Sequence, residues 1–295
     1  MSRHSKIKIG FDLSPLNDKG TFGVCRYAIN LILALSKANE FDISLLYPWT
    51  LEVGKEELSA LAEKQIQFPL RILKTRWWEQ LFLPLLATRA GCQAIHSLGN
   101  VAPSLSPRPV ILTLHDIITY AGGANSSPAT MNYLRRFGFR GVKNASAIIT
   151  VSEFSRREIV EFFGIDGSNI YVVPNGIGRA FVTVTKNRQP SKKSPLVLAC
   201  GSLAPTKNLQ TTLLAFAQIL HRFPEGRLSL FSIAPNSEAF IEAMASNAGI
   251  HASALSFVHA PDEMSMSQIF ADADLLLFPS LSEGFGLPVV EAFAA

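Results

Sequence analysis

The sequence has little cysteine, little charge and no long hydrophobic run. Its three cysteines, Cys25, Cys92 and Cys200, form no CxxC pair, which argues against structural zinc and a disulfide framework. The basic N-terminal segment is not followed by an apolar core, as a signal peptide would be. The longest apolar runs fall far short of the ~20 residues that span a bilayer. These absences predict a cytoplasmic protein.

What is present is sufficient for two packed cores. Apolar residues make up 48% of the 295 residues, and charged residues 17%. The net charge of +4 comes from 27 basic and 23 acidic residues. This modest excess fits anionic small substrates or an anionic membrane surface. It is too small and too scattered to indicate a nucleic-acid partner.

Short apolar runs alternate with stretches of helical period, which predicts an α/β fold with mostly parallel sheets. We expect an N-terminal domain at 1–184, a linker at 185–194 that is polar and basic, and a C-terminal domain at 195–295. The last predicted helix opens at Pro288, so we expect an incomplete second domain and a C-terminal truncation. The expected strands are 7–13, 42–48, 93–97, 109–115, 146–152, 169–174, 195–201, 227–233, 255–258 and 274–280. The expected helices are 24–37, 77–90, 129–144, 153–163, 207–222, 237–247 and 263–271.

The most informative string is SEGFGLPVVE at 282–291, directly after a predicted strand. Gly284 and Gly286 would let the backbone approach a ligand, and the helix that starts at Pro288 would present free amides to an anion. Glu283 and Glu291 flank these amides. This combination suits a sugar diphosphate, with amides for the phosphates and carboxylates for hydroxyls. The alternative is a tight glycine turn in which Glu291 only favours the helix N-terminus.

Three weaker signals also follow strands. Lys207 is expected at the start of a helix, where a bound diphosphate would favour it; the alternative is a solvated lysine. His115 and Asp116 lie where a buried strand meets a loop, and His115 could bind substrate or move a proton; the alternative is a structural histidine. Gly20 and Gly23 precede a helix and could form a phosphate-facing loop.

Together these strings resemble glycosyltransferase family 4, the retaining GT-B enzymes. The resemblance rests on GTFGVCRY, LHDI, IITVSEFSRREI, IYVVPNGI, GSLAPTKN and EGFGLPVVE, which are spread over nearly the whole chain. It implies two Rossmann-like domains that face each other across a cleft. It also implies that a nucleotide-diphosphate sugar is the substrate, with no metal and no cofactor. Many relatives carry an arginine beside the phosphate-binding lysine, whereas Ser202 and Thr206 occupy the candidate positions here.

The resemblance assigns roles by position. Lys207 would contact the donor diphosphate, Glu283 the hydroxyls of the donor sugar and Glu291 the nucleotide ribose. His115 would approach the donor sugar from the N-terminal domain. Further donor contacts are expected from the N-terminal glycine loop at Gly23 and from the amides of Gly284, Phe285, Gly286 and Leu287.

The expected reaction moves a hexose, by analogy mannose, to a saccharide or lipid-linked acceptor in lipopolysaccharide or other surface-polysaccharide assembly. One alternative is an inactive, truncated relative that acts as a binding or scaffold fragment. Another is a different GT-B enzyme, such as a phosphorylase or an epimerase, against which the paired glutamates argue. Arg71, Lys74, Arg76, Trp77 and Trp78 precede an apolar helix within 69–89. This segment is either a contact with the inner face of the membrane or an ordinary core helix with a basic flank.

Overall fold

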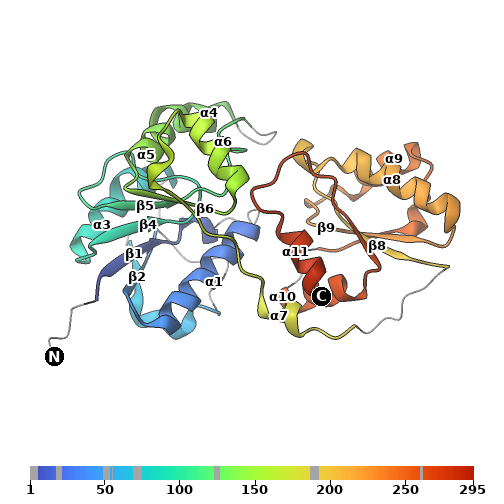
Figure 1. Cartoon of the computed structure of the whole chain (residues 1–295), viewed down its shortest axis with the longest axis horizontal. Helices are drawn as coiled ribbons and strands as arrows, with labels where there is room; N and C mark the ends of the chain where they lie inside the picture. Colours follow the sequence, from blue (N-terminus) through green and yellow to red (C-terminus); the bar gives the residue numbers. More distant parts are fainter. Residues whose placement is uncertain are drawn as a thin grey trace. The chain divides into compact units, whose positions relative to one another are not determined.

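The computed structural model describes residues 6–17, 22–48, 54, 56–68, 75–122, 127–186, 193–259 and 262–295 (Figure 1). The chain divides into two compact units, the first ending at Asn175 and the second beginning at Gly176. The predicted linker 185–194 lies largely outside the described residues and stays a prediction. Within the described residues, no helix has the length and apolar character to cross a bilayer.

The first unit is built on a seven-stranded sheet in the order β3-β2-β1-β4-β5-β6-β7, with every neighbouring pair parallel. All six strands predicted in this half are present, although each is shorter than expected. The additional strand is β3, a short polar segment at the sheet edge. The strands are β1 (Lys8–Asp12), β2 (Asp42–Tyr47), β3 (Gln65–Gln67), β4 (Ala94–Ser97), β5 (Val110–Thr113), β6 (Ala147–Thr150) and β7 (Ile170–Val172).

Two apolar clusters cover the faces of this sheet. In β2, Ile43 and Leu45 belong to the cluster under α1 (Phe22–Ala38), whereas Leu46 belongs to the other cluster. This alternation is what a period of two residues along a strand produces. The second cluster includes residues of helices α4, α5 and α6, which are labelled in Figure 1. Three short 3₁₀ turns complete the unit: η1 (Ser14–Asn17), η2 (Ser59–Lys64) and η5 (Gly167–Asn169).

Two helices of the first unit each contain a π-helical turn. The first runs through α2 (Thr75–Trp77), the π-turn η3 (Trp78–Phe82) and α3 (Leu83–Arg89). The second runs through α4 (Pro128–Tyr133), the π-turn η4 (Leu134–Gly138) and α5 (Phe139–Asn144). The sequence predicted both helices but neither π-turn. Such turns are rare and often mark functional sites. The remaining helix, α6 (Glu153–Phe163), is capped by Ser152 and ends at Gly164, which has a left-handed φ of 59°.

The second unit has a four-stranded parallel sheet in the order β10-β9-β8-β11. All four predicted strands are found: β8 (Leu196–Cys200), β9 (Arg227–Phe231), β10 (Leu255–Phe257) and β11 (Leu275–Leu277). One core cluster joins the sheet to α8 (Leu209–Arg222) and α9 (Glu238–Asn247). Another contains residues of α7 (Arg179–Thr183), α10 (Glu263–Asp272) and α11 (Leu287–Ala294). The 3₁₀ turns are η6 (Pro205–Lys207) and η7 (Ala252–Ala254).

Helix α7 is absent from the sequence prediction and packs within the second unit. Its Phe181 is fully buried, and its ring centroid lies 5.5 Å from that of Phe270 on α10. This contact explains why the second unit begins at Gly176. The C-terminal helix α11 starts one residue before Pro288, close to the predicted start.

Two adjacent tryptophans provide a test of this core. Trp78 is fully buried and donates a hydrogen bond from Nε1 to Asp12 Oδ1 over 2.9 Å, whereas Trp77 is 59% exposed. We expect Trp78→Ala to lower the free energy of unfolding by about 3–5 kcal/mol, because it leaves a cavity and removes a donor from a buried carboxyl. The matched variant Trp77→Ala should change it by no more than about 0.5 kcal/mol. Urea unfolding followed by circular dichroism measures both, and equal effects would contradict the assignment.

Candidate functional site

In the second unit, two loops that follow neighbouring strands are tied together. The loop after β8 and the loop after β11 lie at the same edge because β8 and β11 are parallel neighbours. The amide of Leu281 donates to the Thr206 carbonyl over 2.7 Å, and Asn208 Nδ2 donates to the Pro279 carbonyl over 3.2 Å. In open α/β sheets ligands bind outside the carboxyl ends of the strands. A ligand site is therefore expected at these two loops.

The two loops bring Lys207 and Glu283 into contact. Lys207 Nζ lies 2.5 Å from Glu283 Oε1, and the side chains are 27% and 23% exposed, respectively. The ammonium also lies 5.7 Å from the ring centroid of Phe278. A cation and a carboxylate thus share one partly exposed place beside β8. An ammonium can bind a phosphate group, and a carboxylate can accept hydrogen bonds from sugar hydroxyls.

The position of Lys207 differs from the sequence prediction. It was expected in the first turn of α8, but it ends the 3₁₀ turn η6, and α8 begins only at Leu209. Between them Asn208 adopts a left-handed φ of 54°, a conformation that asparagine tolerates better than most residues. This break directs the chain so that Lys207 meets Glu283, 76 residues further along.

The glycine string leads into α11 as predicted. Gly286 has a φ of 80°, which glycine adopts without steric cost, and Gly284 to Leu287 are all partly buried. Glu291 lies inside α11 and is only 3% exposed, so the structure places it in the interior of the unit. Of the residues predicted for this string, Glu283 contacts Lys207, whereas Glu291 lies one turn into the helix.

In the first unit, His115 directly follows β5 and is 8% exposed. Its amide donates to Asn100 Oδ1 over 2.8 Å, and its ring packs edge-on against Tyr27 with centroids 4.7 Å apart. Burial lowers the pKa of the imidazole to about 4, so the ring is neutral near pH 7. Nε2 lies 3.3 Å from the Leu98 carbonyl, which can only accept, so this nitrogen carries the ring proton.

A hydrogen-bonded network beside His115 was missed by the sequence analysis. His96 Nε2 lies 2.9 Å from Thr113 Oγ1, and Tyr27 Oη lies 3.1 Å from the same oxygen. Burial, and then the neighbouring His115, lower the pKa of His96 to about 4. The sequence signal for this network was a polar side chain at or next to the end of an apolar strand, His96 in β4 and Thr113 in β5.

The other predicted features of this unit are more ordinary. Gly23 lies in the first turn of α1 instead of a loop before it, and a Cβ there would meet no atom within 4 Å. Asp116 accepts a hydrogen bond from the Ile118 amide over 2.9 Å, which forms a local turn. Gly20 lies outside the described residues.

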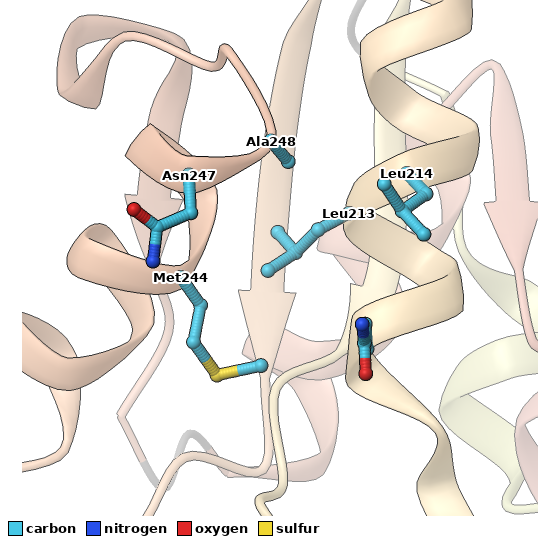
Figure 2. A pocket seen from close by; sticks show the side chains of 6 residues that line it. Leu213, Leu214, Met244, Asn247 and Ala248 are labelled. Atoms are coloured by element: carbon cyan, nitrogen blue, oxygen red, sulfur yellow. The ribbon is translucent and has the colours of Figure 1, made fainter.

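One pocket lies away from these residues. It is a shallow groove between α8 and α9, and Figure 2 shows the side chains of Leu213, Leu214, Met244, Asn247 and Ala248 around it. None of the predicted site residues lines it. Among the residues that the structure describes, no group of three or more histidine, cysteine or acidic side chains could hold a metal ion.

Comparison with known families agrees with this architecture. The profile of Glycosyltransferase Family 4 matches residues 23–180, which is more than half of the chain. The chain belongs to glycosyltransferase family 4. The profile of Glycosyl transferases group 1 matches residues 183–295 and therefore covers the Lys207–Glu283 pair.

The curated relatives of this family 4 chain are distant. It is 24% identical over 204 residues to the serotype-specific mannosyltransferase WbdA of Escherichia coli, covering 63% of this chain and 24% of the relative. It is 24% identical over 197 residues to the O-antigen chain mannosyltransferase B of Escherichia coli, covering 62% of this chain and 50% of that one. The chain thus spans half or less of the length of these two relatives.

Solved structures confirm the predicted GT-B fold. Anabaena HepE, in complex with UDP and glucose, superposes with a TM-score of 0.67 at 17% identity, covering 98% of this chain and 78% of HepE. The lipopolysaccharide outer core galactosyltransferase WaaB gives a TM-score of 0.63 at 13% identity, with the same two coverages. At this level of identity the likeness concerns the fold.

The neutral histidine pair gives a testable pH dependence. His96 and His115 have lowered pKa values of about 4, so we expect neither ring to gain a proton between pH 8 and pH 5.5. The stability that they contribute is complete above the unfolded pKa of about 6.5 and is lost as the pH falls toward 4. Nitrogen NMR of the imidazole rings measures this, with the urea-unfolded chain as the reference that titrates normally. A folded-state midpoint above 6 for both rings would refute the assignment.

Proposed function

We propose that this chain is a retaining hexosyltransferase that uses a nucleotide-diphosphate sugar. The observation that carries the proposal is the Lys207–Glu283 pair, which lies at the carboxyl edge of the second sheet, next to the glycine turn before α11. Mannose is the favoured sugar because two of the relatives are named mannosyltransferases. The acceptor is a saccharide or a lipid-linked saccharide in surface-polysaccharide assembly. No resident metal or organic cofactor takes part in the proposed reaction.

The proposed roles follow from charge and position. Lys207 binds the diphosphate, Glu283 accepts hydrogen bonds from the sugar hydroxyls, and Glu291 holds the nucleotide ribose. The amides from Gly284 to Leu287 line the sugar and phosphates, because a helix N-terminus favours negative charge. In the first unit, neutral His115 accepts a hydrogen bond from a hydroxyl of the donor sugar at Nδ1, because Nε2 donates to the Leu98 carbonyl. For Gly23 the support is its place in the first turn of α1, which would leave its amide free for a phosphate.

The proposed chemistry is substitution on one face of the sugar. The bond between the anomeric carbon and the diphosphate oxygen breaks, and a bond to the acceptor oxygen forms on the same side. The acceptor proton passes to the departing phosphate. No protein nucleophile is needed, so the protein acts by positioning the reactants and stabilising the charge on the leaving group. Lys207 matters most for that charge, because Ser202 and Thr206 stand where many relatives carry an arginine.

A membrane contact is the further part of this proposal. Three apolar side chains spaced four residues apart, Trp77, Leu81 and Leu85, are 59%, 43% and 43% exposed, and Arg76 and Arg89 are exposed beside them. Such a stripe with basic flanks suits the surface of an anionic bilayer, where a lipid-linked acceptor would be found. The sequence grouped Trp78 with this surface, but Trp78 is buried in the core. Arg71 and Lys74 lie outside the described residues.

The paired charges give a direct test of the transfer reaction. We expect Lys207→Ala and Glu283→Gln each to lower kcat/KM for sugar transfer by about a hundredfold or more, because each removes charge that faces the reacting groups. Their unfolding midpoints should stay close to that of the parent protein, since both side chains are partly exposed. Lys193→Ala, at an exposed lysine of the same unit, is the matched control. Normal turnover in both site variants would refute the assignment.

The exposed stripe gives a separate test. We expect the double variant Trp77→Ser, Leu81→Ser to bind anionic phospholipid vesicles about tenfold or more weakly, because it removes two side chains of the stripe. Binding of the parent protein should weaken with added salt. Leu105→Ser changes an exposed leucine elsewhere in the unit and should have no effect. Vesicle sedimentation measures all three, and unchanged binding of the double variant would exclude this surface.

A further inference from the structure

A buried polar cluster lies between the two π-turns of the first unit. Glu79, inside η3, accepts a hydrogen bond from the hydroxyl of Tyr133, the last residue before η4. Gln80 donates from Nε2 to the same hydroxyl oxygen over 2.9 Å. The guanidinium of Arg76 lies 5.3 Å from the centroid of the Tyr133 ring. None of these side chains belongs to the donor site proposed above, and only Arg76 also flanks the exposed stripe of Trp77, Leu81 and Leu85.

Gln80 connects this cluster to the loop that follows β4. Its Oε1 accepts from the Ser104 amide over 2.8 Å, and its Nε2 lies 3.3 Å from the Ala102 carbonyl. Asn144 donates to the Ser104 carbonyl over 2.8 Å from the other side. A Cβ on Gly141 would lie 2.3 Å from the Ala102 oxygen, so the helix approaches this loop closely. The far end of loop 98–104 is therefore held by the side chains of Gln80 and Asn144, which hydrogen-bond to its backbone.

The near end of the same loop sets the position of His115. The side chain of Asn100 accepts from the His115 amide, and the Leu98 carbonyl accepts from the His115 ring. Asn100 itself has a left-handed φ of 64°, and its carbonyl accepts from Tyr120 Oη over 2.9 Å. A continuous series of contacts thus leads from Glu79 through Tyr133 and Gln80 to the loop, and from the loop to His115.

We propose that Glu79 is a positioning residue for His115: through Tyr133 and Gln80 it holds loop 98–104, against which the His115 ring is placed. The contribution of this arrangement to sugar transfer rests on the proposed function. The arrangement of loop 98–104 does not depend on the proposed function, and it can be measured without any substrate.

Glu79 performs this role as a neutral carboxyl group. The groups that face it are Asp12 from β1, Arg76 from α2, Tyr133 from α4 and Tyr120 from the segment after β5. Burial, with the nearby Asp12 carboxyl adding to it, raises the pKa of Glu79 to about 8. Burial also raises the pKa of Asp12, against the hydrogen bonds that it accepts from Trp78 and from the amide and hydroxyl of Ser14. With a pKa of about 8, the Glu79 carboxyl keeps its proton near pH 7.

Amide hydrogen exchange of loop 98–104 tests the structural part in the intact chain without ligand. We expect Glu79→Ala and Tyr133→Phe to speed exchange in this loop about five- to tenfold at pH 7, because each breaks a buried hydrogen-bonded link. Glu79→Gln is neutral and keeps an acceptor for Tyr133, so its exchange should match the parent protein. Tyr171→Phe, at an exposed tyrosine of the same unit, is the control. Unchanged exchange in Glu79→Ala and Tyr133→Phe would overturn the proposal.

The pH dependence separates positioning from simple packing. Between pH 7 and pH 9 the loop of the parent protein should lose protection, relative to the intrinsic exchange rate at each pH, whereas the Glu79→Gln loop should not. The kcat for transfer should fall over the same range in the parent protein and stay level in Glu79→Gln. An identical pH response in both proteins would overturn the role of the carboxyl group. Loss of loop protection without any change in kcat would overturn the link to His115. A parent protein that transfers no sugar contradicts the proposed function, while the exchange experiment still decides the positioning claim.

Discussion

Parallel pairing of the strands is the constraint on which the rest of this structure depends. Because all the strands of the first sheet run the same way, their carboxyl ends form one edge. The last residues of four of these strands are polar and buried: Asp12, Ser97, Thr113 and Thr150. Buried polar groups need partners. Asp12 obtains one from the π-turn η3, and Thr113 obtains partners from α1 and β4, whereas the hydroxyls of Ser97 and Thr150 have none among the described residues. The edge of the sheet thereby fixes where the surrounding helices and loops lie.

The second unit uses the same constraint with fewer elements. The loops after the adjacent parallel strands β8 and β11 lie side by side, and one backbone and one side-chain hydrogen bond join them. Two left-handed residues, Asn208 and Gly286, then turn the chain into α8 and α11. Lys207 and Glu283 lie just before these turns. Their position is therefore set by backbone geometry more than by side-chain packing, which is the arrangement expected of a preorganised anion site.

Local sequence patterns predicted most strands and helices because apolar periodicity reports burial directly. The failures concern features that depend on distant residues. Strand β3 has only three residues and little apolar character, and pairing with β2 alone defines it. Of the neighbouring Trp77 and Trp78, only the second is buried, and its partner Asp12 lies 66 residues away. Residues of the π-turn η3 contact Tyr133 and the loop after β4, which are distant in the sequence. Local sequence propensity therefore did not predict this turn. The sequence predicted separate roles for Lys207 and Glu283 at one site, but it did not predict that the two side chains contact each other.

The contact between Lys207 and Glu283 has a consequence for ligand binding. Each of the two charges is the partner of the other, and their contact joins the loops after β8 and β11. Both side chains remain about a quarter exposed, and ion pairs of this kind contribute little to stability, in the range of about 0–1 kcal/mol. In the proposed reaction, a diphosphate that separates the pair would lose little, while the pairing keeps the two side chains close together. A more deeply buried pair would bind its own partner too firmly to exchange it. Partial exposure thus lets one ion pair hold the two side chains together and still allows the proposed substrate to separate them.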